Sequence, residues 1–222
     1  MKMMYRIVIF FYYLYSFCWC LRYLELKQAI HIPILIHPKV RTKKLHRGAI
    51  CFDAPLRHGM FSFGFEGTIG QSNCQSLISI RKGGKMVVGR DVQMAKGTRI
   101  VINEKGLIKI GNHFWCNGDC YFFSTKSILI GNDNMYGWNI SFNTSDGHNI
   151  YENGIKKTVE GDIRIGNNVW IASHCLISKN TNIADGCVVA QNSLVSKIFD
   201  EQNCLIAGSP AKKVRNNISW EW

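Results

Sequence analysis

Acidic residues are scarce in this chain of 222 residues: 15 Asp and Glu stand against 27 Lys and Arg, for a formal net charge of +12. Such a surplus favours anionic partners, among them nucleic acid, acidic lipid, acidic glycan or a phosphorylated cofactor. The chain has no Lys- or Arg-rich helix with interleaved aromatic residues and no recognisable nucleic-acid motif. We therefore expect no nucleic-acid partner, and the remaining candidates are acidic lipid, acidic glycan and a phosphorylated cofactor.

Closely paired cysteines are also missing. The nine cysteines are scattered and odd in number, and no two have the CxxC spacing. A disulfide framework is typically denser and occurs in a shorter secreted chain, and a structural zinc site uses paired spacing. The pattern predicts reduced, mostly buried thiols in a cytoplasmic protein and no bound metal.

A long apolar run is absent. The longest uncharged stretch, Ile7 to Leu21, has fifteen residues, whereas a spanning helix needs about twenty. Its aromatic residues and the flanking Lys2, Arg6 and Arg22 are typical of the bilayer interface, and its end is a poor signal-cleavage site. We expect an N-terminal helix whose residues 5–24 contact the membrane surface. Two alternatives stay open: packing on its own domain or a neighbouring subunit, and a span or signal peptide.

A six-residue period is what the chain does have. Branched aliphatic residues recur at every sixth position from Ile165 to Val195, and a small residue follows each one. The period returns upstream in three triplets. Their members are Val88, Met94 and Ile100; Ile110, Cys116 and Phe122; and Ile130, Tyr136 and Phe142.

A period of six fits neither an α-helix nor a simple exposed strand. A second apolar residue two places earlier, as at Ile108, Ile128 and Ile163, indicates short strands joined by tight corners, because residues two apart share one face of a strand. Three such strands make a triangular coil of eighteen residues, and stacked coils bury a continuous core. The sequence predicts an all-β fold, a parallel β-helix with an N-terminal hydrophobic helix and a short C-terminal tail.

The spacing of the triplets locates an insertion. Ile130 to Ile165 is seventeen residues longer than one coil, so a loop must leave the prism just after Phe142. We divide the chain into a hydrophobic segment with a basic linker at 1–48, a β-helix at 49–200 with an inserted loop at 143–162, and a basic tail at 201–222.

Three motifs resemble the hexapeptide-repeat acetyltransferases, in the branch that contains galactoside and maltose acetyltransferases and polysaccharide O-acetyltransferases. They are IGNNVWIAS at 165–173, AGSPAK at 207–212, and SDGH at 145–148 on the insertion. The resemblance covers about residues 82–215. It implies a left-handed β-helix, an exception to the usual right-handed crossover. It also implies a homotrimer with active sites between prisms, and acetyl-CoA as co-substrate.

On this resemblance His148 is the candidate general base. A sugar hydroxyl is a weak nucleophile, and a histidine titrates close enough to neutral pH to take its proton and then protonate the leaving thiolate. Asp146 lies two residues earlier and could orient the imidazole. The alternatives are a solvated loop histidine and a turn-forming aspartate before Gly147.

Acceptor contacts are assigned by resemblance to Trp170, Asn143 and Asn139. An indole face can stack on the apolar face of a sugar ring, although packing within the coil explains Trp170 equally well.

The resemblance places cofactor contacts on Ser173, Gln191, Ser196, Lys197, Lys212 and Arg215. The three cations would meet the cofactor phosphates. Position 191 is usually small in the family, so Gln191 departs from the pattern.

The leading functional hypothesis is an acetyl-CoA-dependent O-acetyltransferase acting on a sugar hydroxyl of a bacterial surface polysaccharide, capsule or O-antigen, or of its precursor. It would work in the cytoplasm, with peripheral contact at the inner face of the membrane. The alternative is an N-acetyltransferase for the amino sugar of a nucleotide-sugar. A zinc-dependent β-helix carbonic anhydrase is disfavoured because His113, His148 and His174 include no closely spaced pair. A non-catalytic ice-binding prism is disfavoured because no face of repeated threonines is present.

Overall fold

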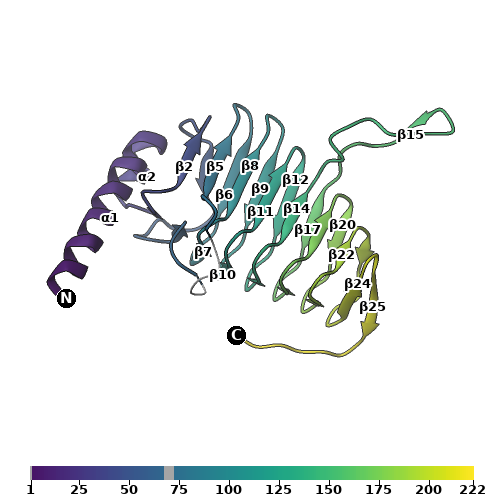
Figure 1. Cartoon of the computed structure of the whole chain (residues 1–222). Helices are drawn as coiled ribbons and strands as arrows, with labels where there is room; N and C mark the ends of the chain where they lie inside the picture. The colour runs from purple at the N-terminus through teal and green to yellow at the C-terminus, as the bar shows by residue number, and fades with distance from the viewer. Residues whose placement is uncertain (1, 68–72) are drawn as a thin grey trace.

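Three parallel sheets form a triangular prism, and each coil of the chain adds one strand to each sheet (Figure 1). This computed structural model describes residues 2–67 and 73–222, and it describes side chains from residue 8 onward within those ranges. We call the sheets A, B and C in the order in which the chain enters them. Every strand pairing in them is parallel except that of the last two strands of sheet A, β24 and β25.

The strand bounds follow the coils. Sheet A consists of β1 (Ile34–Ile36), β4 (Phe61–Phe63), β7 (Val92–Met94), β10 (Phe114–Cys116), β13 (Met135–Tyr136), β18 (Trp170–Ile171), β21 (Val188–Val189), β24 (Leu205–Gly208) and β25 (Ala211–Arg215). Sheet B consists of β2 (Arg41–Lys43), β5 (Leu77–Ile80), β8 (Arg99–Ile102), β11 (Tyr121–Ser124), β14 (Ser141–Asn143), β19 (Leu176–Ser178) and β22 (Leu194–Val195). Sheet C consists of β3 (Ile50–Phe52), β6 (Lys85–Val88), β9 (Leu107–Ile110), β12 (Ser127–Ile130), β17 (Ile163–Ile165), β20 (Thr181–Ile183) and β23 (Ile198–Phe199).

The predicted six-residue period is confirmed as the inward face of the prism. Each residue of the series from Ile165 to Val195 is at most 4% exposed, and so is each member of the three upstream triplets. Equivalent residues stack from coil to coil, since Ile171 pairs with Tyr136 on one side and Val189 on the other. Burying an aliphatic side chain of this size contributes about 1.5–3 kcal/mol, so the stack is the main source of stability.

Close backbone approach at the corners explains the small residues of the period. A Cβ on Gly131 would lie 2.7 Å from the carbonyl oxygen of Gly166 and 2.6 Å from an oxygen of Asn167. Glycine is therefore required here for space between coils, whatever its backbone angles.

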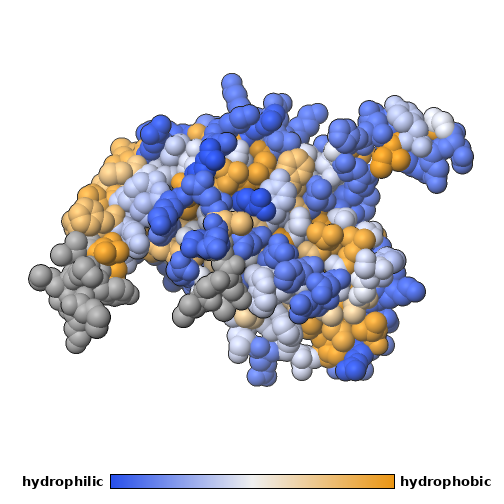
Figure 2. All heavy atoms as spheres, viewed as in Figure 1, coloured by the Kyte–Doolittle hydropathy of each residue, from blue (hydrophilic) through white to orange (hydrophobic). Residues whose placement is uncertain are grey.

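Helix α1 (Lys2–Tyr23) and the short helix α2 (Leu26–Ala29) cover the N-terminal end of the prism (Figure 1). The predicted N-terminal helix is confirmed. Trp19, Cys20 and Leu24 are buried against the first coil, as one of the open alternatives expected. Most side chains of α1 between residues 8 and 15 remain exposed, and Figure 2 shows apolar surface gathered over this end. Among the described residues, no helix is long and apolar enough to cross a membrane.

Strands of the prism also occur on both sides of the range 49–200. Strands β1 and β2 lie in the stretch we assigned to a hydrophobic segment and basic linker, and β24 and β25 lie in the stretch we assigned to the tail. The six-residue period did not predict these first strands because the corners between them are long. Ile34 pairs with Phe61, and Phe61 pairs with Val92. These intervals of 27 and 31 residues are far from eighteen.

Buried thiols are confirmed for six cysteines, namely Cys20, Cys116, Cys120, Cys175, Cys187 and Cys204. Burial raises the pKa of Cys20 to about 11 and that of Cys116 well above its ordinary value. A thiol with a raised pKa is a poor nucleophile, so these side chains serve packing.

Aromatic rings fill the middle of the prism. The ring of Phe142 stacks on Phe122 at 4.7 Å between centroids and on Tyr136 at 5.4 Å. Tyr136 is fully buried, and its hydroxyl is one of the buried side-chain atoms without a hydrogen-bond partner in the described structure. Burial raises the pKa of Tyr136 well above its ordinary value.

We predict that Tyr136→Phe stabilises the protein, because it removes a buried polar group that has no partner. The expected gain is about 1–3 kcal/mol in the free energy of unfolding, measured by urea denaturation. Tyr121→Phe is the matched control, since Tyr121 is only partly buried and its change should be close to zero. Equal stability of wild type and Tyr136→Phe would mean that the hydroxyl is solvated.

Candidate functional site

A loop leaves the prism after β14 and returns at β17, and its base is held by backbone hydrogen bonds. The amide of Gly161 donates to the carbonyl of Thr144 at 2.9 Å, and the amide of Asp146 donates to the carbonyl of Val159 at 3.0 Å. The buried hydroxyl of Thr144 accepts from the amide of Thr125 at 2.8 Å. The outer part is an antiparallel hairpin of β15 (Tyr151–Glu152) and β16 (Ile155–Lys156), which projects from the prism (Figure 1). Both arms of the loop are therefore anchored at its base, and the hairpin at its tip is exposed.

His148 sits on the outgoing arm of this loop, with its side chain exposed. The turn before it is shaped by Gly147, which has a positive φ of 81° and whose amide donates to the hydroxyl of Ser145 at 3.0 Å. A Cβ on Gly147 would meet nothing within 4 Å, so this glycine is needed for its backbone angle and not for space. The turn holds His148 clear of its own prism.

Asp146 forms an ion pair with Lys179, which sequence reasoning did not identify. Its Oδ2 lies 2.6 Å from the Lys179 Nζ, and the same ammonium also donates to the carbonyl oxygen of Thr158. Lys179 follows β19 in the next coil and is the more buried partner, with 18% of its side chain exposed against 35% for Asp146. One cation thus ties both arms of the loop to the prism. The only feature of the sequence that could have indicated this ion pair is the position of Lys179, at the corner that follows the insertion by one coil.

Three of the predicted contact residues, Asn139, Ser173 and Gln191, lie at the corner between sheets A and B. The Nδ2 of Asn139 lies 2.9 Å from the Nδ1 of His174, and the hydroxyl of buried Ser173 accepts from the amide of Trp138 at 3.2 Å. Gln191 is exposed at the same corner of the following coil, where the amide of Asn192 donates to the Ser173 carbonyl at 3.2 Å. The structure therefore places Asn139, Ser173 and Gln191 on successive coils of one corner.

A second group lies at the other edge of sheet B, where that sheet meets sheet C. Asn143 ends β14 and its Oδ1 accepts from the amide of Ser145 at 3.1 Å. Ser196 and Lys197 are exposed in the turn between β22 and β23. The loop carrying His148 starts from this same edge.

Trp170 and the two C-terminal cations belong to sheet A. Trp170 opens β18 with 38% of its surface exposed. Its ring centroid lies 6.2 Å from that of Trp220, whose indole nitrogen donates to the carbonyl of Asn168 at 2.8 Å. The chain after β25 thus folds back over this face, which the sequence did not indicate. Lys212 and Arg215 are exposed on β25, the antiparallel partner of β24.

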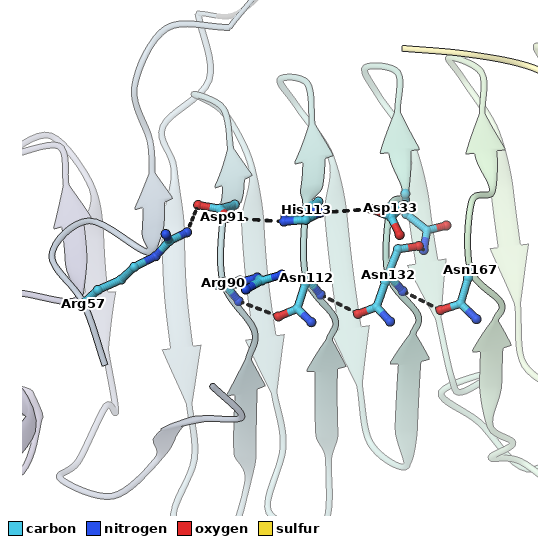
Figure 3. Close-up of polar contacts among 9 residues, drawn as sticks. Arg57, Arg90, Asp91, Asn112, His113, Asn132, Asp133 and Asn167 are labelled. Carbon is cyan, nitrogen blue, oxygen red and sulfur yellow. Dashed lines mark hydrogen bonds and ion pairs between the residues drawn. The ribbon is translucent and has the colours of Figure 1, made fainter. Parts of the chain in front are cut away.

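The histidines considered for zinc lie apart. His174 is at the corner of sheets A and B, His148 is on the loop, and His113 is at the corner of sheets C and A. The ring of His113 lies between two carboxylates, with Nδ1 3.0 Å from Asp133 and Nε2 3.4 Å from Asp91 (Figure 3). Within the described part of the chain, no three His, Cys, Asp or Glu residues are grouped as a metal site.

Beside His113, asparagine side chains link the coils in a ladder (Figure 3). The amide of Asn112 donates to the Oδ1 of Asn132 at 2.8 Å, and the amide of Asn132 donates to the Oδ1 of Asn167 at 2.8 Å. These contacts satisfy backbone donors where the chain turns out of its strands. This corner has a structural role.

Comparison with known proteins supports these assignments of fold and family. A Klebsiella pneumoniae protein named "Uncharacterized 24.8 kDa protein in cps region" is 35% identical over 85% of this chain and 81% of its own length. Galactoside O-acetyltransferase of Escherichia coli K12 is 31% identical over 49% of this chain. Polysialic acid O-acetyltransferase of Escherichia coli O1:K1 is 29% identical over 67% of it. The matches cover 53% and 42% of these two enzymes. No protein-family model matches the chain.

The chain belongs to the hexapeptide-repeat acetyltransferases. The crystal structure of the polysialic-acid-specific acetyltransferase NeuO superposes with a TM-score of 0.51 over 86% of this chain and 89% of that one, at 17% identity. This likeness supports the fold alone. The acetyltransferase has the left-handed β-helix that the resemblance implied.

The Lys179 contacts predict a specific effect on the loop of this acetyltransferase. Lys179→Met should loosen both arms, raising hydrogen exchange at the amides of Asp146 and Gly161 roughly fivefold, because a pair of this exposure contributes about 1 kcal/mol. Lys157→Met is the control, since Lys157 pairs with Glu152 on the outer hairpin. Unchanged exchange in Lys179→Met would show that backbone contacts alone hold the loop.

Proposed function

We propose that this acetyltransferase moves an acetyl group from acetyl-CoA to a sugar hydroxyl in a bacterial surface polysaccharide, capsule or O-antigen, or in its precursor. The single observation that carries the proposal is His148, presented on a rigidly anchored loop of a hexapeptide-repeat acetyltransferase. The acceptor class is supported by the names of relatives, a galactoside O-acetyltransferase, a polysialic acid O-acetyltransferase and a putative lipopolysaccharide biosynthesis O-acetyl transferase.

The proposed reaction is a direct transfer. The sugar oxygen attacks the thioester carbonyl while His148 takes the hydroxyl proton, so the nucleophile gains charge only as the new C–O bond forms. The tetrahedral intermediate collapses by breaking the C–S bond, and the imidazolium returns its proton to the departing thiolate. No residue is acetylated on the way, and the products are the sugar ester and coenzyme A.

Asp146 is proposed to orient and charge-stabilise the imidazole from the same arm of the loop. Lys179 supports this role by holding the carboxylate at 2.6 Å, which fixes the segment that carries both side chains. The ion pair uses Oδ2 of the carboxylate. The imidazole would take its second contact from the other oxygen or from a backbone carbonyl.

Acetyl-CoA is proposed to lie along the corner where Ser173 and Gln191 follow each other on successive coils. Backbone groups at such corners can hydrogen-bond the pantetheine amides. The exposed side chains of Lys197, Lys212 and Arg215 would meet the phosphates. Ser196, the neighbour of Lys197 in the turn after β22, is proposed as a further cofactor contact, and Trp170, Asn143 and Asn139 are proposed acceptor contacts.

A homotrimer is part of the proposal, because one chain does not bring these groups together. Asn139 and Ser173 lie at one edge of sheet B, and His148 starts from the other edge. The strand β14 between them has three residues, or about 10 Å, and the loop then leads away from its own prism. In the proposed trimer, the loop of a neighbouring copy would supply His148 to this corner.

We also propose a cytoplasmic location at the inner face of the membrane. The buried, unpaired thiols fit a reducing compartment. A precursor of a surface polysaccharide that is carried on a lipid would bring the acceptor to that face.

The reaction predicts a large loss of activity in His148→Ala. Turnover should fall by about 10²–10⁴, since positioned acid–base catalysis contributes that much, and Asp146→Asn should lose less. The measurement is release of coenzyme A across a panel of sugars and polysaccharides, with mass spectrometry to identify ester or amide products. Amide products would select the amino-sugar alternative.

The matched control is His31→Ala, because His31 is an exposed histidine near the helices at the far end of the prism. A rate near that of wild type in His148→Ala would remove this residue from the mechanism.

The phosphate contacts predict a change in the Michaelis constant. Replacing Lys212 and Arg215 together with alanine should raise KM for acetyl-CoA roughly tenfold, less than for buried contacts because both groups are exposed. Turnover at saturation should persist, as expected for binding that ground and transition states share.

Lys213→Ala is the control for this pair, since Lys213 points to the other side of β25 and pairs with Glu201. A double variant with an unchanged KM for acetyl-CoA and a raised KM for an acidic acceptor would assign the two cations to the glycan.

A further inference from the structure

Helix α1 is fixed firmly to the prism by its C-terminal half. The amide of Ile36 donates to the hydroxyl of buried Ser16 at 3.0 Å, and the indole nitrogen of Trp19 donates to the hydroxyl of Thr42 at 3.0 Å. Arg47 adds a hydrogen bond to the carbonyl of Leu21 at 2.8 Å. The helix therefore keeps its position, and its free surface is a permanent part of the molecule.

That free surface is apolar where a surface helix is normally polar. Between residues 8 and 15 the exposed side chains are large and uncharged: Val8 (41% exposed), Phe10 (64%), Phe11 (59%), Tyr13 (41%), Leu14 (47%) and Tyr15 (37%). We call these six residues the aromatic face. At 3.6 residues per turn they occupy an arc of about 220° around the axis, while Tyr12, Ser16 and Trp19 turn toward the prism. Leu26 and Ile30 of the adjoining α2 segment add further exposed apolar surface, at 64% and 60% exposed.

Cations surround this face. Between residues 8 and 50 the chain has seven Lys and Arg against one acidic residue, Glu25. Arg22 is exposed in the last turn of α1, with its guanidinium 5.4 Å from the centroid of the Tyr23 ring, and Arg47 is exposed beside that end of the helix. Lys39 is exposed near Tyr12. The surface thus combines aromatic rings with positive charge, which is the composition that suits the headgroup region of a bilayer.

We propose that α1 lies in the plane of a membrane that contains anionic lipids, with the aromatic face in the interfacial layer and the flanking cations on the headgroups. An in-plane position needs no spanning length, because the helix buries one side in the interfacial layer and keeps the other on the protein. This inference rests on the location given in the proposed function and not on the transfer chemistry.

Charge decides between lipid and a second copy of the chain. A neighbouring copy that covered the aromatic face, in the proposed trimer or in a dimer, would bring a second chain of formal net charge +12 against Arg22, Lys39 and Arg47, and like charges oppose such a contact. Anionic headgroups instead attract the same side chains. The docked helix also leaves the transfer site free, because α1 and the loop of β15 and β16 lie toward opposite ends of the prism (Figure 1).

The test is flotation of the full chain with vesicles of phosphatidylcholine, with and without about 30% phosphatidylglycerol. We expect binding to the anionic vesicles that weakens as salt is added, because screening acts on the headgroup contacts. The triple variant Phe10→Ser, Phe11→Ser, Leu14→Ser should lose about tenfold or more in binding. The matched control replaces three similarly exposed apolar residues far from α1, Ile155, Leu176 and Ile198, with serine and should bind as wild type does.

Three outcomes would overturn the proposal. The first is that the wild type fails to float with the anionic vesicles, and the second is that the triple variant floats as well as the wild type. The third is that the triple variant changes the molar mass in light scattering, which would place the aromatic face between copies of the chain. Coenzyme A release with a soluble acceptor, measured on the same samples, reports separately on the transfer reaction and should be unchanged in the triple variant.

Discussion

The stacking of each inward side chain on its equivalents in the neighbouring coils is the interaction on which this molecule depends. Ile171 between Tyr136 and Val189 is one case among many. Hydrogen bonds between parallel strands hold the coils in register, and this register keeps every sixth residue inside the prism. Because a slip of one residue would turn the whole apolar set outward, the pattern specifies one alignment only. The corners must then be narrow, which explains glycine at positions such as 131.

One irregular segment, the loop that we propose to carry the catalytic base, is built into this regular scaffold. The loop after β14 interrupts sheet C's sequence of strands without disturbing their pairing, since Ile128 still pairs with Ile163 across the insertion. Its base belongs to the rigid prism through Thr144 and the Asp146–Lys179 pair, and its outer hairpin is exposed. His148 lies between the anchored base and the exposed hairpin. Its backbone position is set by the prism, while its side chain is exposed, as the proposed reaction with a substrate requires.

The two ends of the prism solve the problem of exposed strand edges in different ways. At the C-terminal end β25 folds back on β24, and the tail then brings Trp220 onto the Trp170 face. At the N-terminal end a helix closes the first coil with Trp19, Cys20 and Leu24. That helix has a second, apolar side that is exposed in the described part of the chain, and this side is what we assign to the membrane.

The sequence by itself determined the repeating part: the period, the inward residues from Val88 to Val195, the insertion after Phe142 and the family motifs. These follow from local spacing, which is written in the order of the residues. Only the tertiary structure decided the first coil, because corners of irregular length hide Ile34 and Phe61 from any period. The same holds for Lys179 and for Trp220, whose partners Asp146 and Trp170 lie 33 and 50 residues away. Contacts between coils and between the tail and a face depend on the number of residues in each turn, and no pattern along the chain records them.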